Sequence, residues 1–380
     1  MPTIRRLAVI SAWLVAVGCG APGSILRVID VVNPDGSFGL KNVEVTTLTD
    51  LDGVTGEAAA FYGGSQIDLN PYAKILDRGA SRDTFVVSSS PVSASYIVDD
   101  GVVISSDFDS LLMLTAYTHF EEAMLHFRSI GVSLPADPPP IDYKPTVNGG
   151  VAFGFPSTDN AAFFSLTDSF VLLPMSVFQD IPFAMNTGVI AHESSHRVFY
   201  YQAWGGQMFS AIYAHQSDPS AQNNFNRAKS TDEGLADFFA ASMTGDPLFI
   251  AKSMTPYSPS LYASIWQDRD LTRAWTLDSA WLNGDQPVVQ GTYNPYPPGT
   301  VLASSLWSIA QSAGFQATEQ AVAIAELALS PQLLGALTYD YGDIECEILR
   351  QLPAAARANA CTVFKTRYAV IASRFAGVCP

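Results

Sequence analysis

The chain has few basic residues: 20 of its 380 residues are lysine or arginine, against 36 aspartates and glutamates, so the formal net charge is -16. This balance offers no electrostatic footprint for nucleic acid or for an anionic lipid surface. Charged residues of both signs make up only 15%, whereas hydrophobic residues make up 48%. Such a composition excludes wholesale disorder and is typical of a globular protein with one large domain or two smaller ones. We therefore expect no nucleic-acid partner.

Several chemical motifs are also absent from the sequence. It contains no Gly-x-Ser-x-Gly elbow and no phosphate-binding loop, which argues against a serine hydrolase or a nucleotide-binding protein. Its 4 cysteines include no Cys-x-x-Cys pair, so a cysteine-based zinc site is not expected. Cys346, Cys361 and Cys379 cluster near the C-terminus, where an oxidising compartment would allow one disulfide. The sequence does not choose the pair.

The N-terminal segment reads as an export signal. Arg5 and Arg6 precede an apolar run that begins at Leu7 and is too short to span a bilayer comfortably. The run ends in Ala-Val-Gly-Cys, which resembles a bacterial lipoprotein processing site with Cys19 as the lipidated residue. We expect residues 1–19 to be a lipoprotein-type signal peptide, with ordinary secretion or a retained anchor as the alternatives. The mature protein would lie in the cell envelope or outside the cell, and it would contact a membrane only through a lipid on Cys19.

The first part of the chain has the pattern of β structure. Between residues 25 and 105, short runs such as LRVIDVV and VEVTTLT are separated by turn signals such as NPDG and DLDG. From Asp107 to Ile130, apolar residues recur at helical spacing and predict an amphipathic helix. We expect a small β-rich N-terminal domain over residues 25–105, followed by a second domain over residues 106–380.

The second part alternates strands and helices. After two strand-like runs, the pattern predicts a helix from about Thr187 to Tyr201 and a polar loop over residues 216–229. Another helix is predicted to start near Ser230, and the chain is mostly helical from Val301 onward. The expected fold class is α+β.

One motif carries chemistry. The predicted helix contains AHESSHRVFYY, in which His192 and His196 are four positions apart and Glu193 directly follows the first. One helix face then presents two imidazoles to a single point, as a Zn²⁺ ion requires. The glutamate next to them can take a proton from a zinc-activated water without being a ligand itself.

A second motif supplies what the first lacks. In Glu233-Gly234-Leu235-Ala236-Asp237, a glutamate and an aspartate are four positions apart on the next predicted helix. Glu233 can provide the third protein ligand, and Asp237 can accept the outer N–H of a ligand histidine. The alternative is that Ser230 and Glu233 form a capping box that opens the helix, without any role in metal binding.

The two motifs together resemble the gluzincin metallopeptidases of the thermolysin and fungalysin type, whose pattern is HExxH followed by ExxxD. The resemblance implies a two-lobed catalytic domain with a β-containing upper lobe and a helical lower lobe. It also implies that His192, His196 and Glu233 bind zinc, that Glu193 is the general base and that Asp237 supports a ligand. The segment from Trp204 to Lys229 would be an insertion.

Two further segments are similar to the same family. NAAFF, which begins at Asn160, is similar to the edge strand that binds the substrate. YPPGTVLASSLWSIA is similar to the fungalysin segment in which a histidine stabilises the oxyanion, and here Tyr296 stands at that place. No histidine follows His215 in this sequence, so we expect Tyr296, Tyr293 or His215 to be the donor. The alternative for Tyr296 is an aromatic plug in a proline-rich turn.

The sequence therefore predicts a zinc-dependent endopeptidase that cleaves peptide or protein substrates, with Zn²⁺ as its cofactor. No partner protein is expected. The alternative is a surface lipoprotein that keeps the zinc fold as a binding or structural module without turnover, an alternative favoured by the missing downstream histidine.

Overall fold

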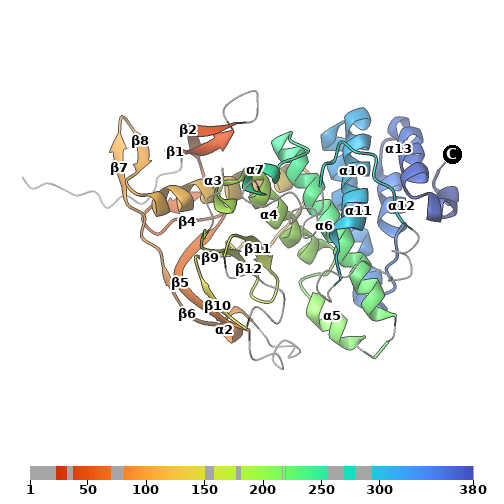
Figure 1. The fold of residues 1–380 in the computed structure, drawn as a ribbon, viewed down its shortest axis with the longest axis horizontal. Helices are drawn as coiled ribbons and strands as arrows, with labels where there is room; N and C mark the ends of the chain where they lie inside the picture. The colour runs from red at the N-terminus through yellow and green to blue at the C-terminus, as the bar shows by residue number, and fades with distance from the viewer. Residues whose placement is uncertain are drawn as a thin grey trace, which may run out of the picture.

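The structure is a computed structural model, and it describes residues 23–31, 37–69, 81–149, 158–176, 181–215, 217–218, 220–254, 269–278 and 293–379. The expected signal peptide and Cys19 lie outside the described residues. Strands gather on one side and helices on the other (Figure 1), so the fold is α+β, as expected. No helix in the described part of the chain has both the length and the apolar character needed to cross a membrane.

The first sheet has four strands in the order β2-β1-β8-β7. Its strands are β1 (Ser24–Val31), β2 (Phe38–Val45), β7 (Tyr96–Asp99) and β8 (Val102–Ser105). β1 pairs antiparallel with β2 and parallel with β8. Leu26 and Val28 of β1 are buried while Arg27 between them is partly exposed, which is the alternation of a sheet with one face on the core.

The second sheet has eight strands, in the order β11-β12-β9-β5-β4-β3, with β6 and β10 also paired to β5. They are β3 (Leu48–Asp50), β4 (Thr55–Gly56), β5 (Ala60–Asp68), β6 (Val86–Pro91), β9 (Pro140–Tyr143), β10 (Thr146–Asn148), β11 (Ala161–Phe164) and β12 (Ser169–Leu172). β5 runs parallel to β9 with Phe61 opposite Ile141. This sheet and the main hydrophobic core combine residues from both sides of the boundary that we expected near residue 105.

α3 (Phe108–Ser129) joins the strands to the helices, since it contacts β1 and β8 as well as α4 (Thr187–Gln202). The carboxylate of Asp107 caps its first turn by accepting the N–H of Ser110 at 2.8 Å. Tyr117 and Phe120 are buried on its inner face. The amphipathic helix predicted between Asp107 and Ile130 is thus confirmed.

The remaining helices form most of the other side of the molecule. They are α2 (Arg82–Phe85), η2 (Phe183–Met185), α5 (Met208–Ala214), α6 (Ala221–Thr244), α7 (Ala251–Met254), α10 (Tyr296–Ala313), α11 (Phe315–Gly335), α12 (Asp343–Gln351), α13 (Ala354–Arg367) and η3 (Ala369–Gly377). α6 packs against both α4 and α10. The elements that carry the two chemical motifs, α4 and α6, are therefore in direct contact.

α6 begins at Ala221, so the prediction of a polar loop up to residue 229 and a helix start near Ser230 is wrong. Polar side chains in this stretch find partners while the backbone is helical: Gln222 donates to Asn226 at 2.9 Å, and Asn224 donates to the carbonyl oxygen of Leu337 at 2.7 Å. Composition alone suggested a loop because such side chains often compete with the backbone for hydrogen bonds. The start at Ala221 also places Ser230 inside the helix, where it opens no capping box.

The cysteine pair that the sequence left open is Cys361 with Cys379. The disulfide ties α13 to the end of the described chain. Cys346 is partly exposed and free, and its thiol lies 3.6 Å from the carbonyl oxygen of Arg374.

Candidate functional site

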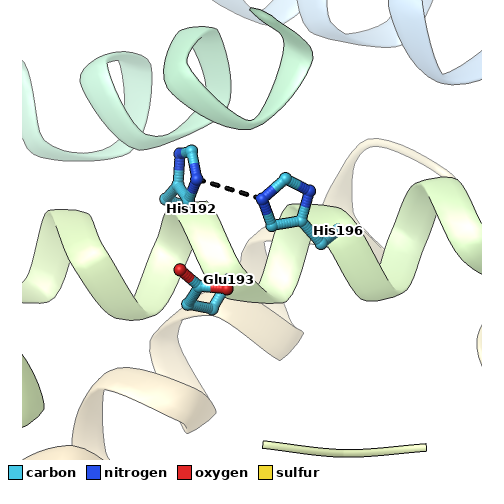
Figure 2. Close-up of side chains that lie close together, drawn as sticks. All are labelled: His192, Glu193 and His196. Atoms are coloured by element: carbon cyan, nitrogen blue, oxygen red, sulfur yellow. Dashed lines mark hydrogen bonds between the residues drawn. The ribbon is translucent and has the colours of Figure 1, made fainter. Parts of the chain in front are cut away.

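α4 presents the two histidines of the first motif to one point. The helix starts firmly, because the side-chain oxygen of Asn186 accepts the N–H groups of Gly188 and Val189 at 3.0 and 3.3 Å. The Nε2 atoms of His192 and His196 are 3.0 Å apart (Figure 2). Two nitrogen donors that face each other so closely are placed to share a cation.

Glu233 of α6 reaches the same point. Its Oε2 lies 3.5 Å from Nε2 of His192 and 3.7 Å from Nε2 of His196. This oxygen is buried and makes no hydrogen bond. A buried carboxylate oxygen without a hydrogen bond is costly, and a cation between the three side chains would reduce that cost.

The donor set favours zinc. Two imidazole nitrogens and one carboxylate oxygen are three protein ligands typical of catalytic zinc sites, which keep one position open. Within the part of the chain that the structure describes, His192, Glu193 and His196 form a group whose ligand atoms all lie within 4.8 Å of one another, and Oε2 of Glu233 lies within 3.7 Å of the Nε2 atoms of both histidines. The residues present therefore fit a zinc ion.

Each histidine has its own carboxylate on the outer side. Nδ1 of His192 lies 3.0 Å from Oδ1 of Asp237, and Nδ1 of His196 lies 2.8 Å from Oδ1 of Asp232. Nδ1 of His196 is hydrogen-bonded to Asp232, which leaves the lone pair of that imidazole on Nε2, toward the common point. Nδ1 of His192 lies near the Asp237 carboxylate without forming a hydrogen bond. The sequence predicted that Asp237 lies beside the outer nitrogen of a histidine. It did not predict that Asp232 lies beside the outer nitrogen of the other histidine.

These carboxylates shift the pKa values of the site. Burial alone would lower the pKa of both imidazoles, but the neighbouring carboxylates raise it, for His196 to about 10. Burial alone would raise the pKa of the Glu233 carboxyl, but His192, His196 and Arg269 outweigh it and lower that pKa to about 2. Glu233 is thus a permanent anion at neutral pH, which suits a metal ligand.

Glu193 faces the edge of the second sheet. Its Oε2 accepts the backbone N–H of Phe163 in β11 at 2.7 Å, and the side chain is almost fully buried. Burial raises the pKa of its carboxyl, although the two histidines oppose this shift. β11 is an edge strand of its sheet, and Asn160 directly precedes it in the sequence. A carboxylate with a raised pKa next to a strand edge is well placed for proton transfer to a bound peptide.

Tyr296 is the first residue of α10, and the carboxylates of Glu233, Glu193 and Asp237 are near enough to affect its hydroxyl. The guanidinium carbon of Arg269 is 4.6 Å from the centre of its ring. Burial, together with the charges of Glu233 and Glu193, raises the pKa of the Tyr296 hydroxyl well above 10. The phenol therefore keeps its proton and can donate a hydrogen bond.

The two other candidate donors are hydrogen-bonded elsewhere. The hydroxyl of Tyr293 lies 2.5 Å from the hydroxyl of Ser230 and 3.4 Å from that of Tyr341. Nε2 of His215 is 2.9 Å from the carbonyl oxygen of Gly335. The charges of Glu233 and Glu193 contribute to the raised pKa of Tyr296, whereas they do not contribute to that of Tyr293.

Sequence reasoning missed Arg269. Its guanidinium is buried and holds both oxygens of Asp237, with Nε at 2.9 Å from Oδ2 and Nη2 at 2.5 Å from Oδ1. Nη2 also lies 3.8 Å from Oε2 of Glu233. No motif marks this arginine. Asp232 could have been found, because a site with two ligand histidines needs two outer acceptors and Asp232 directly precedes Glu233.

The solved structures to which the chain is similar are distant ones. No protein-family model matches the chain, and no curated protein matches it. Among solved structures, the precursor of protealysin, a metalloproteinase from Serratia proteamaculans, is similar at 13% sequence identity. The match covers 81% of this chain and 87% of that chain, with a TM-score of 0.44. A similarity this distant does not assign the chain to a family.

Proposed function

We propose that the chain is a zinc-dependent endopeptidase of the gluzincin type. The observation that carries the proposal is the position of Glu233, whose buried Oε2 has no hydrogen bond and lies within 3.7 Å of the Nε2 atoms of His192 and His196. Helix packing alone does not account for a buried carboxylate oxygen that lies between two imidazoles and makes no hydrogen bond. A metal site explains all three side chains at once.

His192, His196 and Glu233 would hold the zinc. When bound, the metal supplies Lewis acidity that makes water more acidic and polarises a carbonyl group. Asp232 would keep the Nδ1 proton of His196 in place by its hydrogen bond, and the Asp237 carboxylate, 3.0 Å from Nδ1 of His192, would do the same once the metal orients that ring. Arg269 fixes Asp237 through both of its oxygens.

Glu193 would act as the general base and then as the general acid. It takes a proton from the water that attacks the carbonyl carbon, and it gives that proton to the nitrogen as the C–N bond breaks. The hydrogen bond from the N–H of Phe163 holds the carboxylate at the edge of β11. The raised pKa of Glu193 suits both roles, since it brings the carboxyl closer to neutral pH.

β11 would bind the substrate. An extended peptide can add to the edge of a sheet by backbone hydrogen bonds, and Asn160 at the start of β11 would bind it there. Tyr296 would donate its hydroxyl proton to the oxyanion that forms on the attacked carbonyl. The helices α6 and α10 would belong to a lower lobe and the second sheet to an upper lobe, with the substrate between them.

We also propose that the protein is exported and held in the cell envelope by a lipid on Cys19. The motif at residues 16–19 supports this, and a change of Cys19 to Ser would release the protein into the soluble fraction. The membrane would be contacted through that lipid, and a peptide or protein would be the substrate.

The direct test combines metal content with cleavage of a labelled peptide. The wild-type protein should hold one zinc per chain and lose activity reversibly with a chelator. Glu193→Gln should keep the zinc and lose kcat by a factor of about 100 or more. Glu57→Gln is the matched control, because Glu57 is exposed and pairs with Arg128 on the surface.

The same experiment separates the enzyme from the structural alternative. Zinc binding without cleavage, together with unfolding when the metal is removed, would support a structural or binding module instead. Full activity of Glu193→Gln would end the proposed mechanism.

A further inference from the structure

A loop about 100 residues after α6 contacts the first half of that helix. This loop, residues 336–342, connects α11 to α12. The hydroxyl of Tyr339 lies 2.5 Å from the hydroxyl of Thr231, and both residues are buried. The carbonyl oxygen of Leu337 accepts a hydrogen bond from Asn224 at 2.7 Å. Leu337 adopts a φ of 45°, a left-handed conformation that a residue with a Cβ keeps only when its surroundings hold it.

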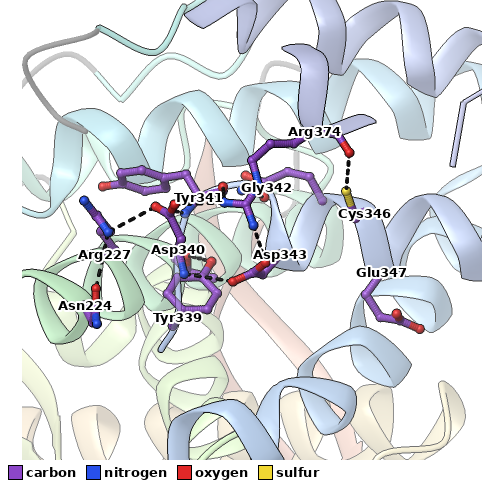
Figure 3. A network of polar contacts seen from close by, with 12 residues as sticks. Asn224, Arg227, Tyr339, Asp340, Tyr341, Gly342, Asp343, Cys346, Glu347 and Arg374 are labelled. Carbon is purple, nitrogen blue, oxygen red and sulfur yellow. Dashed lines mark hydrogen bonds and ion pairs between the residues drawn. The ribbon is translucent and has the colours of Figure 1, made fainter. Parts of the chain in front are cut away.

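Charged groups join the same loop to α6 and to the C-terminal segment (Figure 3). Oδ1 of Asp340 lies 3.1 Å from Nη1 of Arg227 on α6, and its Oδ2 lies 2.9 Å from Nη1 of Arg374 on η3. Arg374 also pairs with Asp343 at 2.6 Å and donates to the carbonyl oxygen of Tyr341. Asp340 thus bridges two arginines from different elements, which fixes the loop against α6.

A second contact with a tyrosine is made by Ser230, which directly precedes Thr231 in α6. The hydroxyl of Ser230 lies 2.5 Å from that of Tyr293, which in turn is 3.4 Å from the hydroxyl of Tyr341. Tyr341 is buried, so this is an interior contact. Serine and threonine at positions 230 and 231 are therefore both held by tyrosines.

These contacts end where the metal ligands begin. Asn224, Arg227 and Thr231 are spaced three and four residues apart and share one face of the helix. Asp232 and Glu233 follow directly. Side chains project outward from the helix axis. A rotation of α6 about that axis would therefore move the Glu233 carboxylate away from the imidazoles.

We propose that Tyr339 and Asp340 are positioning residues, which fix the rotation of α6 and thereby raise the affinity of the metal centre for zinc. The inference rests on the proposed function, since it concerns the ligands of that centre. Neither residue touches the ligands, so the effect passes through Thr231 and Arg227. A loop that served stability alone would leave the metal affinity of a folded variant unchanged.

The test measures zinc affinity by competition with a chromophoric chelator, and ligand geometry by the visible spectrum of the Co²⁺-loaded protein. Tyr339→Phe removes only the hydroxyl that contacts Thr231, and it should weaken zinc binding about tenfold and change the Co²⁺ bands. Thr231→Val should do the same. Thr231→Ser keeps the hydroxyl and should bind zinc like the wild-type protein.

Tyr117→Phe is the matched control. Tyr117 is also a buried tyrosine whose hydroxyl contacts a threonine, Thr47, at 3.0 Å, but it lies on α3. This variant should keep the wild-type zinc affinity and Co²⁺ spectrum. A loss of affinity in Tyr117→Phe equal to that in Tyr339→Phe would show a general effect of stability and would overturn the inference.

Two further outcomes are decisive. A folded Tyr339→Phe protein with wild-type zinc affinity and an unchanged Co²⁺ spectrum overturns the positioning role but leaves the proposed function intact. A wild-type protein that binds no zinc overturns the proposed function and this inference with it. If Tyr339→Phe does not fold, Asp340→Asn decides by the same two measurements. The side chain of Asp340 is 42% exposed, and asparagine has nearly the same volume, so this change removes the charge that pairs with Arg227 without creating a cavity.

Discussion

Gly234 on α6 and Gly299 on α10 face each other so closely that a Cβ on Gly234 would lie 2.4 Å from the carbonyl oxygen of Gly299. In the other direction, a Cβ on Gly299 would lie 2.7 Å from the carbonyl oxygen of Ser230. Both contacts are with backbone atoms, which cannot rotate away as a side chain can. The close approach of the two helices also brings Tyr296, one turn before Gly299, close enough to Glu233 for that charge to raise the pKa of its hydroxyl.

Replacing either glycine should therefore destabilise the protein. Gly234→Ala and Gly299→Ala should each lower the free energy of unfolding by about 1–3 kcal/mol, because the helices must move apart to admit the methyl group. Urea unfolding measures this change. Gly335→Ala is the control: its added Cβ meets no atom within 4 Å, and its stability should stay within about 0.5 kcal/mol of the wild type. Wild-type stability in Gly234→Ala would contradict the close packing.

The carboxylate of Asp232 should matter for the metal as much as that of Asp237. Asp232→Asn keeps an acceptor oxygen for Nδ1 of His196 but removes the negative charge 2.8 Å away. We expect zinc binding to weaken about tenfold or more, as is usual for such outer partners. Competition with a chelator measures the affinity. Asp99→Asn, an exposed position on β7, should leave it unchanged, and equal affinities in all three proteins would exclude a role for Asp232.

The histidine pair, and the pair of Glu233 and Asp237, could be proposed from the sequence because the spacing within each pair is local. Two residues four apart share a helix face wherever the helix lies, which is why His192 with His196, and Glu233 with Asp237, could be proposed as a set. That Glu233 reaches the histidines is a tertiary fact, shown by its distances of 3.5 and 3.7 Å to them. The sequence motif predicted that Glu233 is a third ligand but could not show that it lies near the histidines.

Other features depend on contacts that no local pattern encodes. Arg269 reaches Asp237 from a segment without regular structure, 32 residues away along the chain. β5 pairs with β9 although α3 lies between them in the sequence. The alternation of polar and apolar residues predicts a strand but does not indicate which strand it pairs with. The pairing of β5 with β9 crosses the boundary that we expected near residue 105. The start of α6 was misjudged because Asn224 is satisfied by Leu337, a residue that only the folded chain brings near.

Tyr296 should affect turnover and leave metal binding unchanged. If its hydroxyl donates to the oxyanion, Tyr296→Phe should lower kcat by a factor of about 100, with KM and zinc content close to wild type. Because burial and nearby carboxylates raise its pKa well above 10, the hydroxyl should remain a donor throughout the alkaline range accessible to the enzyme. Peptide cleavage kinetics measure the change. Tyr213→Phe, on the exposed side of α5, is the control, and an unchanged kcat in Tyr296→Phe would support the aromatic-plug alternative.

The metal-free protein should lose stability as the pH rises. The ordinary pKa of histidine is 6.5, and in the folded chain burial is outweighed by Asp232 and Glu233, which raise the pKa of His196 to about 10. The folded state thus binds this proton more tightly than the unfolded state does. The stabilisation is fully present below pH 6.5 and is lost as the pH rises to about 10.

His196→Gln removes this titration and leaves the other groups in place. In the presence of a chelator, the wild-type protein should therefore lose more stability than His196→Gln between pH 7 and pH 10, by on the order of a few kcal/mol. Urea unfolding at each pH measures the difference. With saturating zinc the wild-type loss should disappear, because a ligand histidine carries no proton on the nitrogen that binds the metal. Parallel curves for the two metal-free proteins would show that Asp232 and Glu233 do not hold a proton on His196.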